Sequence, residues 1–140
     1  MKDNRKKSKF ISMMGVILLM AMIMATGVGA APITQTIPLG PNRAETARSA
    51  TRSGDYSYVT VRCTAVYPTE VDSYDKYNKM RAQVLFVDRS EMSDQEIIYE
   101  GRAAERIDLY EGTLTRKSIQ FIFKAYNLES ARADVTYDPK

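Results

Sequence analysis

The sequence predicts a mainly β protein: a small antiparallel β-sandwich, of the immunoglobulin-like or Greek-key kind, that follows an N-terminal signal helix. Three observations lead to this prediction. About 110 residues remain after the signal, which is enough for one domain with its own core. Four segments of these residues alternate apolar and polar side chains with the period of two that a half-buried strand requires. Turn residues separate the segments at fairly regular spacing, which is typical of a sandwich.

The first 30 residues have the features of an export signal. An apolar run follows a basic head, and the side chains of residues 28–30 fit a signal peptidase, so we predict cleavage between Ala30 and Ala31. An uncleaved membrane anchor is the alternative, because residues 10–31 supply the roughly 20 apolar positions that a bilayer core requires. Residues 31–140 lie outside the cytoplasm in both cases. The basic residues are Lys2, Arg5, Lys6, Lys7 and Lys9, and the apolar run extends from Phe10 to about Ala25.

The net charge of +3 belongs to the signal and not to the rest of the chain. Residues 1–30 hold five of the 20 basic residues and one of the 17 acidic residues, which leaves 15 basic and 16 acidic residues and a net charge of −1. The remaining basic residues are interspersed with acids and form no stripe along the sequence. We therefore predict no nucleic-acid partner.

Residues 31–54 are predicted to form a flexible polar lead. They contain Pro32, Pro38 and Pro41, followed by a small and polar stretch from Arg43 to Gly54. Such a composition buries too little apolar surface to offset the entropy of ordering the chain. The predicted organisation is therefore a signal peptide over residues 1–30, a lead over residues 31–54 and a sandwich domain over residues 55–140.

Two strands are predicted in the first half of the domain. Residues 56–67 alternate and end at Pro68, and residues 80–87 alternate after a polar loop. We expect these two strands to form an antiparallel pair. One face of the first strand carries Val59, Val61, Cys63, Ala65 and Tyr67, and one face of the second carries Met80, Ala82, Val84 and Phe86.

Two further strands are predicted near the end of the chain, on either side of a turn at residues 127–131. The first carries Ile119, Phe121, Phe123 and Ala125 on one face, and the second carries Ala133, Val135 and Tyr137.

The segment from Ser93 to Gly112 supports two interpretations. A capping box at residues 93–96 and a possible C-terminal glycine at Gly112 favour a helix. An internal Gly101, the run Ile97-Ile98-Tyr99 and the spacing of two between the next apolar residues favour two short strands that meet near Gly101. We predict the two strands and keep the helix as the alternative.

Cys63 is the only cysteine of the chain, so it has no partner for an internal disulfide. In an exported protein it could form an intermolecular disulfide or act as a reactive thiol. Because it shares a strand face with Val61 and Ala65, we predict instead a small core side chain.

The composition excludes several enzyme classes. The chain contains no histidine, so a Ser-His-Asp or Cys-His mechanism and a histidine-containing zinc site are excluded within one chain. Two carboxylates could serve a glycosidase, but the chain has no tryptophan to stack on a sugar. The same carboxylates lack the spacing of a calcium loop. The acidic clusters are Glu70-Asp72-Asp75 and Asp88-Glu91-Asp94-Glu96.

Tyrosine is the unusual feature of the exported part, which contains all nine tyrosines. Tyrosine and arginine are the residues that protein interfaces favour. Tyrosine is also a good strand residue, which explains most of these positions without a partner. Tyr74 and Tyr77 lie in the polar loop, where an aromatic residue has less structural reason to be, and are candidates for a loop contact.

We therefore expect a small secreted or cell-surface protein that is not an enzyme and acts as a binding module. No residues are assigned to a catalytic, cofactor-binding or metal site. The expected partner is a protein or a component of the cell envelope, with membrane contact only through an uncleaved signal. The alternative is a secreted, bacteriocin-like effector that acts on another cell. The organisation resembles that of many small exported proteins of Gram-positive bacteria, a resemblance that implies no activity.

Overall fold

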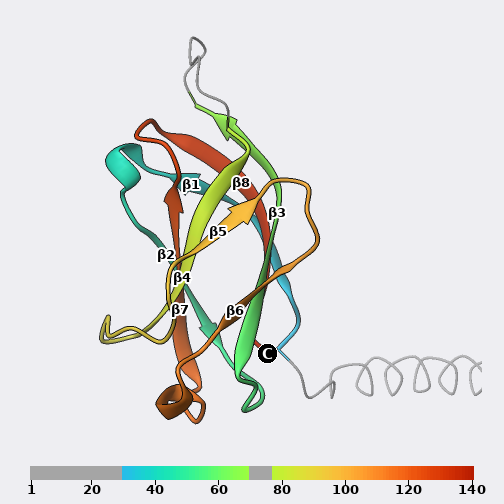
Figure 1. The fold of residues 1–140 in the computed structure, drawn as a ribbon, viewed down its shortest axis with the longest axis vertical. Helices are drawn as coiled ribbons and strands as arrows, with labels where there is room; N and C mark the ends of the chain where they lie inside the picture. The colour runs from blue at the N-terminus through green and yellow to red at the C-terminus, as the bar shows by residue number, and fades with distance from the viewer. Residues whose placement is uncertain (1–29, 70–76) are drawn as a thin grey trace, which may run out of the picture.

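The structure, a computed structural model, describes residues 30–69 and 77–140 and confirms the predicted β-sandwich. Two antiparallel sheets of four strands each account for most of these described residues (Figure 1). The predicted signal helix lies outside them. No helix within the described ranges is long and apolar enough to cross a membrane. The strands are β1 (Ile33–Leu39), β2 (Thr46–Thr51), β3 (Tyr58–Pro68), β4 (Lys79–Phe86), β5 (Glu96–Tyr99), β6 (Glu105–Asp108), β7 (Ser118–Ala125) and β8 (Ala131–Asp138).

The strand order is β1-β8-β3-β6 in the first sheet, sheet A, and β2-β7-β4-β5 in the second, sheet B. The first strand pairs with the last, the second with the seventh, and so on to β4 with β5, as in a long hairpin folded over on itself. This is a jelly roll, which contains two Greek keys. The immunoglobulin-like alternative was wrong, because its first two strands share a sheet, whereas β1 and β2 lie in different sheets.

The prediction of a flexible lead over residues 31–54 was wrong, because this segment supplies one strand to each sheet. In β1, Ile37 and Leu39 are fully buried and belong to the core. The domain therefore begins at about Ile33 and not at residue 55. Pro38 is compatible with a strand here because β1 is at the edge of sheet A, where a proline interrupts no central ladder.

The predicted pairing of the two strands at residues 56–67 and 80–87 was also wrong. The corresponding strands, β3 and β4, lie in different sheets, where β3 pairs with β6 and β8 while β4 pairs with β5 and β7. The connection between them is long enough to cross from one sheet to the other. Alternation showed that each strand exists but carried no information about its neighbours.

A bulge in β3 changes the face that its last residues present. The register with β8 shifts between Cys63 and Ala65, so Val66 is buried where strict alternation predicts Ala65. An extra residue in one strand of an antiparallel pair has this effect. The predicted inward positions Val59, Val61 and Cys63 are confirmed, whereas Ala65 is not among the buried residues.

The two strands predicted between Ser93 and Gly112 are confirmed as β5 and β6, and the helix alternative is wrong. The chain turns at Gly101, whose φ of 72° lies in the left-handed region that glycine adopts without steric cost. Gly112 lies in the short 3-10 helix η2 (Glu111–Thr113). Both strands predicted near the C-terminus are confirmed as β7 and β8.

The core lies between the two sheets and contains a cluster of three aromatic rings. Phe121 and Phe123 project from β7 of sheet B, and Tyr137 projects from β8 of sheet A. The Tyr137 ring centroid lies 4.7 Å from that of Phe121 and 5.6 Å from that of Phe123. The Tyr137 hydroxyl accepts a hydrogen bond from Gln35 Nε2. The cluster therefore joins the two sheets while the buried hydroxyl keeps a partner.

Arg52 holds together the loops at the end of the sandwich that carries the C-terminus. Its side chain is only 2% exposed, and its guanidinium donates hydrogen bonds to the carbonyl oxygens of Leu114, Arg116 and Tyr56. Burial lowers the pKa of Arg52, and the charge of Asp55 opposes this effect. The Arg52 guanidinium therefore joins the β2–β3 and β6–β7 loops by binding their backbone carbonyls.

Candidate functional site

The outer faces of the two sheets differ in charge. On sheet A, the strand residues that point outward include three arginines and three aspartates, which balance one another. On sheet B, the outward strand residues include three cations and no carboxylate. The outer face of sheet B is therefore the strongly cationic one. The charged residues are Arg62, Arg106, Arg132, Asp108, Asp134 and Asp138 on sheet A, and Lys79, Arg81 and Lys124 on sheet B.

Tyrosine rings lie among these cations. Lys79 Nζ is 3.9 Å from the ring centroid of Tyr126 and 5.8 Å from that of Tyr99. Arg81 Cζ is 5.0 Å from the Tyr126 centroid, and Arg102 Cζ is 4.2 Å from the Tyr99 centroid. All four contacts are within the range of a cation-π interaction. We call this group, with the adjoining Arg43, the tyrosine-cation surface: Arg43, Lys79, Arg81, Tyr99, Arg102 and Tyr126.

Four separate segments of the chain build the tyrosine-cation surface. Lys79 and Tyr99 are directly paired residues on β4 and β5, and Arg102 follows β5. Tyr126 lies in the turn after β7, and its carbonyl oxygen accepts a hydrogen bond from Nε of Arg43 in the helix η1 (Pro41–Arg43). The helix η1 and the turn after β7 lie at the end of the sandwich opposite the C-terminus (Figure 1). The surface thus lies toward the far end from the point where the described chain begins and ends.

Like charges are opposed on this face. Arg81 and Lys124 are paired residues on β4 and β7, an arrangement that destabilises a sheet. Glu45 offsets part of the repulsion through a salt bridge to Lys124, at 3.0 Å, and also forms a salt bridge to Arg89. The hydrogen bond from Lys124 is the largest cause that lowers the pKa of Glu45. Within the described residues, Lys79, Arg81 and Arg102 form no salt bridge with a carboxylate.

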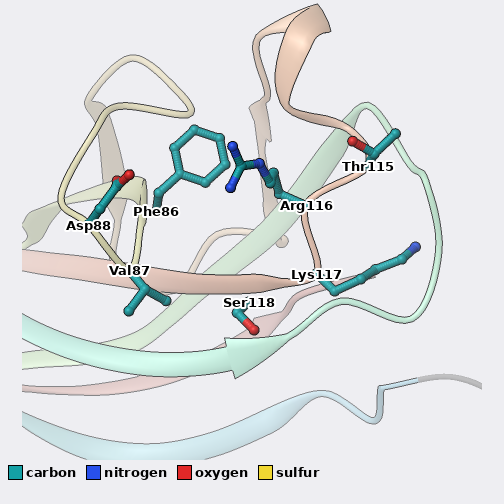
Figure 2. Close-up of a pocket in the computed structure, with 7 residues that line it drawn as sticks. All are labelled: Phe86, Val87, Asp88, Thr115, Arg116, Lys117 and Ser118. Carbon is teal, nitrogen blue, oxygen red and sulfur yellow. The ribbon is translucent and has the colours of Figure 1, made fainter.

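A hollow of about 520 Å³ lies at the other end of the sandwich, between the turn after β4 and the segment before β7 (Figure 2). The guanidinium of Arg116 faces the Phe86 ring, with Cζ 5.1 Å from its centroid. The Lys117 side chain points away from the hollow, and its Nζ lies 2.6 Å from Asp55. Asp88 accepts two hydrogen bonds from Ser90, which lower its pKa. Because these groups already contact one another, the hollow is the weaker candidate.

The acidic clusters singled out in the sequence do not form a site in the described part of the chain. Glu70, Asp72 and Asp75 lie outside the described residues. In the second cluster, Asp94 accepts a hydrogen bond from the Tyr110 hydroxyl at 2.9 Å, and Glu91 faces Gln83 at 3.5 Å. No group of three histidine, cysteine or acidic side chains comes together among residues 30–69 and 77–140.

The candidate loop tyrosines have different outcomes. Tyr74 lies outside the described residues. Tyr77 packs against the core, and its hydroxyl donates a hydrogen bond to Glu129 Oε2 at 2.8 Å. Tyr77 is therefore a structural residue, and the prediction of a loop contact was wrong for it.

Cys63 is a core side chain, as predicted. It is 1% exposed and forms no disulfide. Burial, followed by the nearby carboxylates of Glu100 and Asp134, raises the pKa of its thiol to about 12. A thiol in this state is a poor nucleophile.

Sequence reasoning missed the tyrosine-cation surface. Alternation in residues 79–87 does place Lys79 and Arg81 on one face, which was the available signal. The approach of Tyr126 and Lys124 depends on the pairing of β4 with β7, and that pairing has no local signature. Comparisons with protein-family models, with curated proteins and with solved structures found no match.

Proposed function

We propose that this protein is an exported, non-catalytic binding module whose tyrosine-cation surface binds an anionic component of the cell envelope. The observation that carries this proposal is the opposition of Arg81 and Lys124, with Lys79 beside them and no carboxylate among the outward strand residues of sheet B. Such an arrangement is unfavourable in the isolated domain. Local violations of this kind are expected at functional sites.

The chemistry of the surface indicates what the partner must offer. Arginine and lysine side chains that lack a carboxylate partner attract phosphate or carboxylate groups. The rings of Tyr99 and Tyr126 add flat apolar area with polar hydroxyl groups, which suits a chain that alternates apolar units with charged ones. An anionic envelope polymer has this chemistry. The cations already lie against tyrosine rings, so their side chains lose less freedom on binding.

The position of the surface also supports an exported module. If the signal is cleaved, the surface belongs to a secreted domain with both ends of its chain at the opposite end of the sandwich. If the signal is retained as an anchor, the same geometry directs η1 and the turn after β7 away from the attachment point. Both forms leave the surface available to the envelope.

The test is a calorimetric titration of the purified protein with three probes: sodium polyphosphate, poly-L-glutamate and neutral dextran. We expect binding of at least one polyanion and none of dextran, with an affinity that falls as salt is added because salt screens exposed charges. Absence of heat with both polyanions at low salt would overturn the proposal.

A single-stranded DNA is the control for specificity. Selective binding of an envelope-type polyanion requires that DNA bind no more tightly than polyphosphate at equal phosphate concentration. Tighter binding of DNA, with stacking of bases on Tyr99 and Tyr126, would contradict the proposed partner class. Inhibition of growth by the protein alone would instead favour the effector.

A further inference from the structure

We propose that β1 is exchanged between two copies of this chain, so that β1 of one copy completes sheet A of the other. The strand is suited to exchange by its position. It is the first described strand, it lies at the edge of sheet A, and its only neighbour in that sheet is β8. It can therefore leave its own sandwich without drawing any other strand with it.

The link between β1 and β2 is strained in the closed chain. Asn42 has φ 54° and ψ 31°, and Arg43 has φ 57°, so two consecutive residues other than glycine adopt the left-handed conformation. L side chains are disfavoured there, and asparagine tolerates the conformation better than arginine does. Short strained hinges favour strand exchange, because the exchanged form can relax them.

The residues at the two ends of the link are already extended. Gly40 has φ −67° and ψ 162°, and Ala44 has φ −58° and ψ 142°. A change of Asn42 and Arg43 to extended values would therefore open the turn and lengthen the arm between β1 and β2. The arm would carry β1 away from its own sandwich and toward that of a second copy.

Exchange preserves the contacts that β1 makes. Seven residue pairs join β1 to β8, and Ile37 and Leu39 fill the core beneath them. A second copy supplies the same residues in the same register, so the open and closed forms differ mainly in the hinge. The closed hinge keeps the hydrogen bonds from Asn42 N–H to the Leu128 carbonyl and from Arg43 Nε to the Tyr126 carbonyl. In the exchanged form, Asn42 and Arg43 of each chain leave the left-handed conformation, which removes the backbone strain of the closed hinge.

The exchanged dimer displays two tyrosine-cation surfaces in one assembly, in each of which Arg43 moves with the hinge while the residues on and after β4, β5 and β7 stay in place. If the proposed function holds, two linked sites on a repeating polymer bind more tightly than one site does, without any new contact. The exchange itself rests only on the geometry of β1 and its hinge. Failure of polyanion binding would therefore leave the exchange intact, and absence of exchange would leave the binding site intact.

An engineered disulfide between β1 and β8 distinguishes the two forms. Thr34 and Thr136 are paired residues whose Oγ atoms are 2.9 Å apart, so cysteines at both positions suit a disulfide. The full chain carrying Thr34→Cys, Thr136→Cys and Cys63→Ala is concentrated in detergent, refolded, oxidised and run on a non-reducing gel. We expect a disulfide-linked dimer in the double-cysteine chain and none when Thr34→Cys is the only cysteine. Disulfide-linked monomer alone would overturn the proposal.

Hinge variants give an independent measurement. Glycine adopts the left-handed conformation freely, so Asn42→Gly with Arg43→Gly should stabilise the closed form and lower the association constant of the dimer about tenfold or more. Pro38→Ala is the matched control, because it alters β1 and leaves the hinge unchanged. An unchanged association constant in the glycine variant would contradict the role of the hinge.

Discussion

Arg81 lies directly opposite Lys124 across strands β4 and β7, on the outer face of sheet B. Two cations in this position repel each other, and Glu45, which forms a salt bridge to Lys124, offsets part of the repulsion. Sheet A carries arginines and aspartates in equal number on its outer face. The imbalance on sheet B is therefore a local feature of one face.

Replacement of Glu45 by glutamine tests this electrostatic account. The pKa of Glu45 is lowered from its ordinary value of 4.5, so its carboxylate stabilises the fold above that pH and loses its effect as the pH falls through the folded value. Urea unfolding of Glu45→Gln should show a loss of up to about 1 kcal/mol at neutral pH, since the salt bridges are partly exposed. The difference from the unmodified chain should vanish in acid. An equal difference at both pH values would show that charge is not the cause.

Glu45→Gln should also bind polyphosphate more tightly than the unmodified chain does. The variant removes the carboxylate that forms a salt bridge to Lys124 and leaves the cations in place. We expect a severalfold increase in affinity by calorimetry. A decrease would indicate that Glu45 positions the cations and does not compete with the ligand.

Arg52→Met should destabilise the domain severely. The substitution leaves the carbonyls of Tyr56 and Leu114 without their donor in a buried setting, which costs about 2–4 kcal/mol of unfolding free energy. Arg62→Met, at an exposed position, is the matched control and should change stability little. Equal effects of the two variants in urea unfolding would refute the role of Arg52 in joining the loops.

The bulge in β3 is tested by asparagine substitutions at positions 64 and 66. Val66 is buried and Thr64 is exposed, so Val66→Asn should lower the unfolding free energy by about 2–4 kcal/mol while Thr64→Asn should be nearly neutral. Strict alternation without a bulge would expose Val66 and bury Ala65. A neutral Val66→Asn variant would therefore contradict the observed register.

The Cys63 thiol should make stability depend on pH in the alkaline range. The folded pKa of about 12 lies above the ordinary value of 9.0, so the neutral thiol is favoured by the fold, and its contribution is lost as the pH rises from 9.0 toward 12. Relative to Cys63→Ala, the unmodified chain should lose stability over this range. A thiol reagent at neutral pH should modify the unfolded chain and not the folded one. Rapid modification of the folded chain would show that Cys63 is accessible.

Strands with one uniformly apolar face could be predicted from the sequence. β7 and β8 alternate without exception on their inward side, because each inward residue packs against the opposite sheet. Edge strands carry a weaker signal. In β2, Arg48 and Ala50 point inward at the edge of the sandwich. A long cationic side chain can still reach solvent there, so the inward face of an edge strand need not be apolar. The sequence of β2 is therefore typical of a loop.

The pairing of strands and the tyrosine-cation surface could not be predicted. Tyr126 and Lys79 are 47 positions apart in the chain, and their approach depends on the pairing of β4 with β7. Sequence reasoning paired consecutive strands, which is the common case. In this jelly roll most strands instead pair with a partner far along the chain, as β1 does with β8. The residues of the surface were visible, but the topology that gathers them was not.

The most direct test compares charge removal on the two outer faces of the sandwich. One variant combines Lys79→Gln, Arg81→Gln and Arg102→Gln, and the other combines Arg62→Gln, Arg106→Gln and Arg132→Gln, so both lose three positive charges. Calorimetric titration with polyphosphate should show a loss of binding in the first variant and nearly unchanged binding in the second. Equal losses in the two variants would show that attraction depends on overall charge, and would contradict a binding site on the tyrosine-cation surface.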